Sequence, residues 1–189
     1  MDKIPIEVSA RHVHLSKNDL EKLFGSDYEL KVFKQLTQPS DFAAKETVDI
    51  SVGGKTIKSV RVVGPLRQKT QIEISKTDSF SLGVNPPIRL SGDLDESLGV
   101  KLIGPKGEVD LSEGLIVAKR HLHCATSEAS ELGIKNGDRV SVEVNSTRPV
   151  VFNEVLVRVR DDYSLCLHLD TDEGNAAGLD RTGKGVIVK

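Results

Sequence analysis

Short stretches in which apolar and polar residues alternate occur along most of the chain, and this period of two is typical of β-strands with one buried face. Turn signals separate them, among them Gly53-Gly54, Gly104-Pro105 and Asn136-Gly137. The helical patterns between them are brief. Many short strands with only short helices predict an all-β barrel architecture. The expected strands cover residues 47–52, 56–63, 71–75, 100–103, 139–144, 150–159 and 165–169.

The chain contains an internal duplication. The sequence IEVSARHVHLS from Ile6 matches IVAKRHLHCAT from Ile116, since each has an alternating stretch, Arg-His-x-His and a hydroxyl residue before a short helical pattern. Further along, the segment that ends at Gly83 matches the segment that ends at Gly178. A repeat on this scale predicts two tandem, pseudo-symmetric β-barrels with short capping helices.

Hydroxyl residues and glycines mark where the short helices should begin and end. In the first repeat, Ser16 with Asp19 resembles a capping box, and Gly25 is the expected end of the helix. In the second repeat, Thr126 is the expected N-cap and Gly133 the expected end.

All five histidines fall at related positions of the repeat. Each repeat has one His-x-His pair, and residues two apart on a strand project to the same side. When the repeats are aligned on their final glycines, a carboxylate in the first repeat stands opposite the fifth histidine in the second. The two resulting groups are His12, His14 and Glu73, and His121, His123 and His168.

These two groups predict two metal centres with three protein ligands each. A single His-x-His pair is more often a surface feature, but here the pair occurs twice with an equivalent third ligand. Three protein ligands leave a coordination position open, which indicates catalysis and not only structure. Zinc suits imidazole and carboxylate ligands, with cobalt, iron and manganese as alternatives. Cys124 and Cys166 have no counterparts in the other repeat and are interpreted as small buried apolar residues.

Composition excludes several classes of protein. The 189 residues include 26 basic and 28 acidic residues without long runs of either sign, and aromatic residues make up only 4%. Neither a nucleic-acid surface nor an anionic-membrane surface is expected from this composition. The longest apolar runs are far below the ~20 residues that span a bilayer. Two cysteines are too few for a disulfide framework, which favours a reducing cytoplasm.

Five motifs together give the chain a family resemblance. They are SARHVHLS, GPLR followed by QIEIS, RLSG, AKRHLH and HLDTDEGNAAG, and they extend over essentially the whole sequence. The set resembles the PduL-type phosphotransacylase (phosphate propanoyltransferase) family of propanediol degradation. The resemblance implies a reversible reaction in which a short-chain acyl-CoA, propanoyl-CoA or acetyl-CoA, and phosphate give an acyl phosphate and coenzyme A. It also implies two zinc ions, a homodimer, and an acetate or propionate kinase as a pathway partner.

The resemblance further implies how the chain is divided. In that fold the N-terminal strand joins the C-terminal half, so residues 1–10 with 119–189 would form the first barrel. Residues 11–118 would form the second barrel, and the active site would lie at their interface.

Specific substrate contacts also follow from the resemblance. Arg67 is implied to bind phosphate and to act in catalysis, with Ser91 nearby. Arg67 comes just before the strand that carries Glu73, and a planar guanidinium suits phosphate there. The implied coenzyme A contacts are Ser9, Lys34, Arg61 and Asn175.

One departure from the family pattern concerns location. Members that enter bacterial microcompartments carry an N-terminal amphipathic extension, whereas only five residues precede the first expected strand here. The sequence therefore favours a free cytoplasmic enzyme, with the microcompartment lumen as the alternative.

Two other functions compete with this interpretation. A dinuclear metallohydrolase acting on a thioester or amide could also use His-x-His, but the amidohydrolase barrel needs about 250 residues and regular long helices. A metal-binding or storage module would bind zinc but neither coenzyme A nor acyl phosphate, and it would not explain the presence of Arg67.

Overall fold

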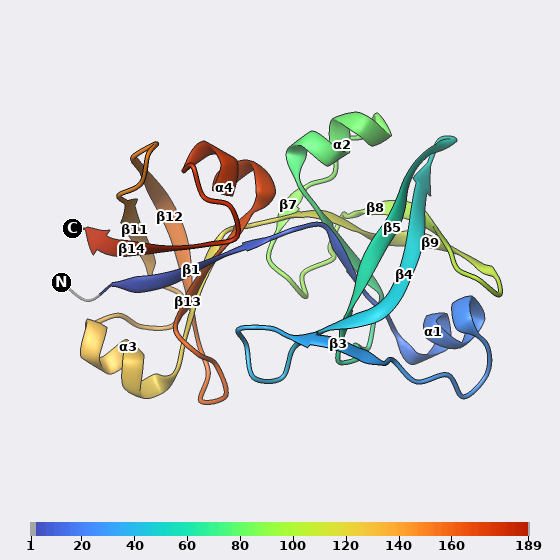
Figure 1. Cartoon of the computed structure of the whole chain (residues 1–189), viewed down its shortest axis with the longest axis horizontal. Coiled ribbons are helices and arrows are strands. Elements are labelled where there is room, and N and C mark those ends of the chain that lie inside the picture. Colours follow the sequence, from blue (N-terminus) through green and yellow to red (C-terminus); the bar gives the residue numbers. More distant parts are fainter. Residues whose placement is uncertain (1–2, 189) are drawn as a thin grey trace. The chain divides into compact units, whose positions relative to one another are not determined.

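The computed structural model describes residues 3–188 and is mostly β (Figure 1). Its strands are β1 (Ile4–Ser9), β2 (His12–His14), β3 (Val32–Gln35), β4 (Phe42–Val52), β5 (Lys55–Gly64), β6 (Gln71–Ile74), β7 (Ile88–Arg89), β8 (Leu98–Ile103), β9 (Glu108–Ala118), β10 (His121–Cys124), β11 (Arg139–Val144), β12 (Val150–Val159), β13 (Cys166–Asp170) and β14 (Thr182–Val188). Its helices are α1 (Lys17–Phe24), α2 (Lys76–Leu82), α3 (Thr126–Leu132) and α4 (Thr171–Ala176). Among the described residues, no helix has both the length and the apolar character needed to cross a membrane.

The chain divides into two compact units. Barrel 1 consists of the residues up to Ala10, the segment Thr37–Pro39 and the residues from Lys119 onward, and barrel 2 of Arg11–Leu36 and Ser40–Ala118. The segment Thr37–Pro39, which the family resemblance placed in the second barrel, therefore groups with barrel 1. Its Gln38 side chain exchanges two hydrogen bonds with the backbone of Ser164, at 3.0 and 3.1 Å.

Each unit contains a closed ring of strands. In barrel 1 the order is β1-β13-β10-β12-β11-β14, and β14 pairs back onto β1. In barrel 2 the order is β4-β5-β2-β6-β9-β8, and β8 pairs back onto β4. The short strands β3 and β7 attach to β4 and β9 outside this ring. The prediction of two barrels from a duplicated sequence is thus confirmed.

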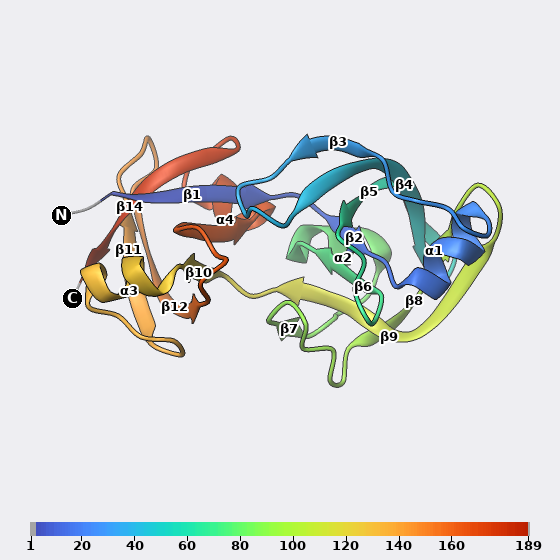
Figure 2. The ribbon, with the colours of Figure 1, turned by 90° about the horizontal axis from the view of Figure 1, so that it is seen from below.

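The two rings have the same pairing pattern. The His-x-His strand β2 runs parallel to β5 and antiparallel to β6, and all three are labelled in Figure 2. In barrel 1, β10 runs parallel to β12 and antiparallel to β13. β6 then pairs in parallel with β9, as β13 pairs with β1. Since β1 leads into β2 and β9 leads into β10, each His-x-His strand follows a strand of the other barrel. A parallel neighbour cannot be joined by a tight hairpin, and β5 and β12 are accordingly separated from β2 and β10 by a helix and at least one further strand.

Each barrel has its own apolar core. Val13 and Ile72 belong to the core of barrel 2, and Leu122 and Leu167 to that of barrel 1. These residues alternate along the strands with the histidines and with Glu73. Because successive side chains on a strand point to opposite faces, the predicted metal ligands lie on the face of the sheet turned away from the core.

Ser16 and Gly25 bound α1 as expected, but the predicted capping box is incomplete because the Ser16 backbone donates to Thr70 and not to Asp19, and the cap of α3 differs from the prediction. Ser16 caps α1, with its side chain accepting from the Asp19 backbone, and the helix ends at Gly25. The N-cap of α3 is Ala125 and not Thr126 as predicted, because the Glu128 carboxylate accepts from the Ala125 backbone. Thr126 instead donates its hydroxyl to Asp161.

The cores give a first prediction about stability. Leu122 is fully buried between two predicted ligands, so Leu122→Ala should lower the free energy of unfolding by about 2–5 kcal/mol through the cavity that it leaves. Val151 is 43% exposed, and Val151→Ala is the matched control, expected to change stability by less than about 0.5 kcal/mol. Urea denaturation measures both. Equal effects of the two substitutions would contradict the assignment of Leu122 to the core.

Candidate metal centres

The barrel 2 group consists of His12 and His14 on β2 and Glu73 on β6. His12 stands opposite Glu73 in the antiparallel register, and the His12 Nε2 to Glu73 Oε2 distance is 3.7 Å. His14 Nε2 lies 3.9 Å from the other carboxylate oxygen, Oε1. One ligand atom from each of the three residues lies within 4.8 Å of the others. The strand register thus brings the three predicted ligands of the first repeat together.

The ring of His14 is oriented by the backbone. Its Nδ1 lies 3.0 Å from the Val63 carbonyl oxygen, and because a carbonyl oxygen can only accept, Nδ1 carries the proton. Nε2 is then left with its lone pair on the side of Glu73. Burial, followed by the charges of His12 and Arg67, holds the pKa of His14 well below its usual range, so the ring is neutral. A neutral imidazole anchored through its other nitrogen is the arrangement found in metal-ligating histidines.

Glu73 is buried and ionised. Burial alone would raise the pKa of this carboxyl, but the electrostatic effect of His12, a hydrogen bond from Ser91 and the charge of Arg67 outweigh burial, and the pKa is lowered to about 2. The carboxylate is therefore available as a metal ligand throughout the physiological pH range.

A hydrogen-bond network links Glu73 to Arg67. The Ser91 hydroxyl donates to Glu73 Oε1 at 2.7 Å and accepts from Arg67 Nη1 at 2.8 Å. Gln71 donates to the same carboxylate oxygen at 2.6 Å, and its own amide oxygen accepts from the Gly92 backbone at 2.7 Å. The structure thus brings together the two predicted phosphate residues and a predicted ligand. Gln71 was not among the predicted site residues, although it precedes Glu73 by two residues and so shares its strand face.

The barrel 1 group consists of His121 and His123 on β10 and His168 on β13. His121 stands opposite His168 in the register, as His12 stands opposite Glu73 in barrel 2. The ring centroids are 4.5 Å apart for His121 and His123, 5.2 Å for His121 and His168, and 4.9 Å for His123 and His168. His121 Nδ1 lies 2.9 Å from the Lys119 carbonyl oxygen, which leaves its Nε2 as the ligand atom.

His123 provides the most direct test of whether a metal fits. Both of its ring nitrogens are buried, and neither has a hydrogen-bond partner in the described part of the chain. Burial, with the charges of His121 and His168, lowers the pKa of His123 to about 2, so protonation does not satisfy the ring. One face of the ring stacks on Tyr163 with centroids 4.0 Å apart. A buried polar group without a partner is costly, and a bound cation would satisfy the Nδ1 or Nε2 lone pair.

His168 has further polar neighbours. Glu7 and Cys166 form a second possible donor group with it, so the two groups of barrel 1 share one histidine. Burial, together with the charge of Glu7, raises the pKa of Cys166 to about 12, and the residue is therefore a neutral thiol. The amide nitrogen of Gln38 lies 3.3 Å from His168 Nε2. Gln38 is far from His168 in sequence and belongs to no motif, so no sequence pattern predicted this contact.

The four residues expected to contact coenzyme A are divided between the barrels. In barrel 1, Ser9 ends β1 and Asn175 is exposed on α4. In barrel 2, Lys34 is exposed on β3, and Arg61 on β5 stands opposite His12 in the parallel register. Arg61 donates to the carbonyl oxygens of residues 44 and 45 at 3.0 and 2.8 Å, which fixes its guanidinium beside β4.

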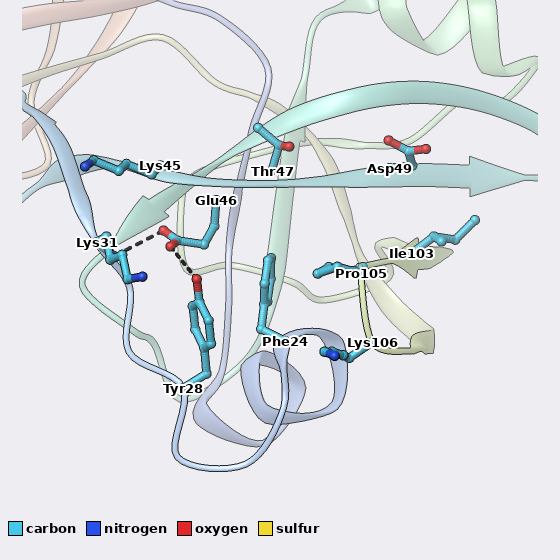
Figure 3. A pocket seen from close by; sticks show the side chains of 11 residues that line it. Phe24, Tyr28, Lys31, Lys45, Glu46, Thr47, Asp49, Ile103, Pro105 and Lys106 are labelled. Atoms are coloured by element: carbon cyan, nitrogen blue, oxygen red, sulfur yellow. Dashed lines mark hydrogen bonds between the residues drawn. The ribbon is translucent and has the colours of Figure 1, made fainter.

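Barrel 2 also has an open pocket of about 700 Å³ that includes none of these residues. Its lining includes Phe24, Tyr28, Lys31, Glu46 and Lys106 (Figure 3). Both carboxylate oxygens of Glu46 are already used, one by the Tyr28 hydroxyl at 2.8 Å and the other by the Lys31 backbone at 3.1 Å. This carboxylate therefore holds the loop after α1 against β4.

Known proteins are similar to this chain over nearly its whole length. A family model described as phosphate propanoyltransferase matches residues 5–180. A phosphate propanoyltransferase of Thermotoga maritima is 53% identical over 98% of this chain and 88% of its own length. One from Levilactobacillus brevis is 50% identical over 100% of this chain and 90% of its own length, and one from Listeria monocytogenes 41% over 98% and 87%.

These similarities cover the two barrels and both histidine groups. The protein is an acyltransferase. Within that class, the chain belongs to the phosphate propanoyltransferase family, as the motif resemblance predicted.

The unsatisfied His123 ring gives a prediction for the pH dependence of stability. In the metal-free protein its folded pKa, about 2, lies below the ordinary value of 6.5. Its contribution to stability is therefore fully present above pH 6.5 and is lost as the pH falls, because only the unfolded chain takes up the proton. His123→Phe keeps a ring that can stack on Tyr163 but removes this titration.

Urea denaturation in the presence of a chelator, between pH 6 and pH 4, measures the effect. The free energy of unfolding of the parent protein should fall more steeply than that of His123→Phe, by about 1.4 kcal/mol per pH unit. Parallel curves for the two proteins would contradict a buried, neutral His123.

Proposed function

We propose that this protein catalyses the reversible conversion of propanoyl-CoA or acetyl-CoA and phosphate to the acyl phosphate and coenzyme A, by direct transfer with two zinc ions. Family membership supports the reaction class. The observation that carries the proposal is the chain of contacts from Arg67 through Ser91 to Glu73, which couples a phosphate-binding cation to a metal-ligand group.

The donor sets suit zinc. Two imidazoles with a carboxylate, and three imidazoles, are both zinc ligand sets that leave a position open for substrate or water. When bound, zinc would polarise the thioester carbonyl as a Lewis acid and stabilise the departing thiolate. The ligands would be His12, His14 and Glu73 in barrel 2, and His121, His123 and His168 in barrel 1.

Phosphate binding is assigned to Arg67 and Ser91. A guanidinium matches phosphate with two parallel N–H donors, and it keeps its charge at every relevant pH. The Ser91 hydroxyl can give phosphate a further hydrogen bond in exchange for the one that it makes to Glu73. This cation and hydroxyl would fix one phosphate oxygen toward the thioester carbonyl, and such orientation accounts for a large share of the rate of a bimolecular reaction.

The residues of the chain favour direct transfer over an acyl-enzyme. Burial raises the pKa of both Cys166 and Cys124, so neither is a thiolate near neutral pH. Histidines that hold a metal cannot also act as free bases. In the proposed step a phosphate oxygen forms the new C–O bond as the C–S bond breaks, and the sulfur leaves with the electron pair and takes up a proton.

Coenzyme A contacts are proposed for Lys34 and Arg61 in barrel 2 and for Ser9 and Asn175 in barrel 1. The two cations suit the phosphates of coenzyme A, and the serine and the asparagine offer hydrogen bonds. We also propose that the chain acts as a cytoplasmic homodimer. An acetate or propionate kinase would then use the acyl phosphate that it makes.

The decisive experiment is an assay of purified protein with acetyl-, propanoyl- and butanoyl-CoA, with and without phosphate. Thiol release should require phosphate, and hydroxylamine should trap an acyl phosphate. Thiol release without phosphate would instead identify a metallohydrolase, and no turnover would favour a metal-binding module. Elemental analysis of the same protein should find about two zinc ions per chain. One zinc or none in fully folded, unchelated protein would contradict the two-centre proposal.

Arg67 and Glu73 should separate phosphate handling from metal binding. Arg67→Ala should retain zinc and coenzyme A affinity but lower the rate at fixed phosphate by about 100-fold, because it removes a charge-assisted contact to the reacting anion. Arg67→Lys should rescue only part of this loss, since it offers a point charge without the planar fork. Glu73→Gln should lose zinc from barrel 2 and impair the use of both substrates.

Zinc analysis and steady-state kinetics at varied phosphate test this set of variants. Unchanged phosphate kinetics in Arg67→Ala would mean that another group binds phosphate.

A further inference from the structure

An arginine comes immediately before each His-x-His pair, and in barrel 2 this residue is Arg11. Its Nε and Nη2 lie 2.9 and 2.6 Å from Asp78 Oδ1. The other oxygen of Asp78, Oδ2, accepts from the backbone of Ser75, the N-cap of α2, at 3.2 Å. The Asp78 carboxylate therefore connects Arg11, which precedes the first ligand, to Ser75, which follows the third ligand, Glu73, by two residues.

Barrel 1 has the same arrangement with different residues. Arg120, which precedes His121, donates from Nη1 to Glu173 Oε1 at 2.6 Å. The other oxygen of Glu173, Oε2, accepts from the backbone of Asp170, the N-cap of α4, at 3.4 Å. Asp170 follows the third ligand, His168, by two residues. Arg120 is further anchored by two donations to the Asn153 carbonyl oxygen, at 2.9 and 2.7 Å.

These contacts close the end of the strand pair that carries the ligands. The first and third ligands face each other across that pair, as His12 faces Glu73 and His121 faces His168. Each arginine lies one residue before the first ligand. Through the carboxylate it is connected to the N-cap of the helix after the facing strand, two residues beyond the third ligand. The bonds are charge-assisted, and the carboxylate side chains are only 7% and 19% exposed, while the side chains of Arg11 and Arg120 are 46% and 32% exposed.

The arginine contact is specific to the helices that follow a third ligand. The helices α1 and α3 also have an acidic residue at the third helical position, Asp19 and Glu128. Within residues 3–188, Asp19 is bonded to Ser16 and Thr70, and neither Asp19 nor Glu128 pairs with an arginine. Helix capping alone therefore does not require an arginine partner. The arginine–carboxylate contact is present at α2 and α4, the two helices that follow a third ligand.

We propose that Arg11 and Arg120 are positioning residues for the two metal centres, each holding the third ligand of its own barrel in register with the His-x-His strand. This inference rests on the metal-binding part of the proposed function. Groups that hydrogen-bond to metal ligands typically change metal affinity by a factor of 10 to 100, and these arginines act one step further out, through the helix cap that follows the third ligand. The effect must be local, so that each arginine acts on the centre of its own barrel.

Cobalt-loaded protein, titrated against a chromophoric chelator, tests the proposal centre by centre. A His123→Phe background leaves the barrel 2 centre, and a His14→Ala background leaves the barrel 1 centre. Arg11→Gln should weaken cobalt binding about 10- to 100-fold in the first background, and Arg120→Gln should do the same in the second. The lysine variants should recover part of the affinity, and the cobalt absorption band should shift when the ligand geometry relaxes.

Matched controls remove ion pairs outside the centres. Lys101→Gln in barrel 2 breaks the pair with Glu108, and Arg139→Gln in barrel 1 breaks the pair with Glu154. Both should leave cobalt affinity unchanged. Asp78→Asn and Glu173→Gln remove the charge that the arginine contacts but keep an amide oxygen for the cap. They therefore test the same inference if an arginine variant fails to fold.

Thermal unfolding with and without cobalt separates positioning from simple stabilisation. A positioning role predicts a smaller rise in Tm on cobalt binding, because weaker binding stabilises less. An equal loss of Tm in the metal-free and loaded forms, with cobalt affinity unchanged within twofold, would overturn the inference. Failure of the parent protein and of both backgrounds to bind cobalt or zinc would instead contradict the proposed metal centres themselves.

Discussion

The structure of both candidate centres depends on the register of one antiparallel strand pair in each barrel. His12 faces Glu73 and His121 faces His168, so a shift of one residue would turn a ligand into the apolar core. Alternate residues on these strands are buried in that core, and their packing therefore specifies the register. The ligands owe their convergence to the same apolar residues that stabilise the barrels.

The two centres share a topology but differ in charge. The barrel 2 group includes the Glu73 carboxylate, whose pKa is lowered to about 2. Gln71 and Ser91 donate hydrogen bonds to this carboxylate, and the Arg67 guanidinium donates to Ser91. The barrel 1 group consists of three imidazoles. Among the described residues, the neutral ring of His123 has no hydrogen-bond partner at either nitrogen. This difference supports assigning phosphate to the side of Arg67, where a fixed cation lies next to an anionic ligand group.

In both halves of the duplication, the chain crosses from one barrel to the other just before the His-x-His pair. The strand that leads into each His-x-His pair belongs to the other barrel, and the arginine stands where the chain leaves that strand. Arg11 is the first residue after the crossing and Arg120 is the second, after Lys119, and each lies opposite a helix that begins just after the third ligand. A duplicated gene segment would keep such a contact in both copies while the carboxylate changes between Asp78 and Glu173.

The sequence by itself determined the barrels, the repeat and the two groups of candidate ligands, because these depend on local period, on spacing and on similarity between segments. Tertiary structure alone decided the contacts of Gln38 and Tyr163 with the ligand groups, since such contacts join residues without a shared motif. It also moved the cap of α3 from Thr126 to Ala125, because Asp161, distant in sequence, takes the threonine hydroxyl. Hydrogen bonds between distant segments follow from how the strands close into barrels, and a linear pattern carries no information about that closure.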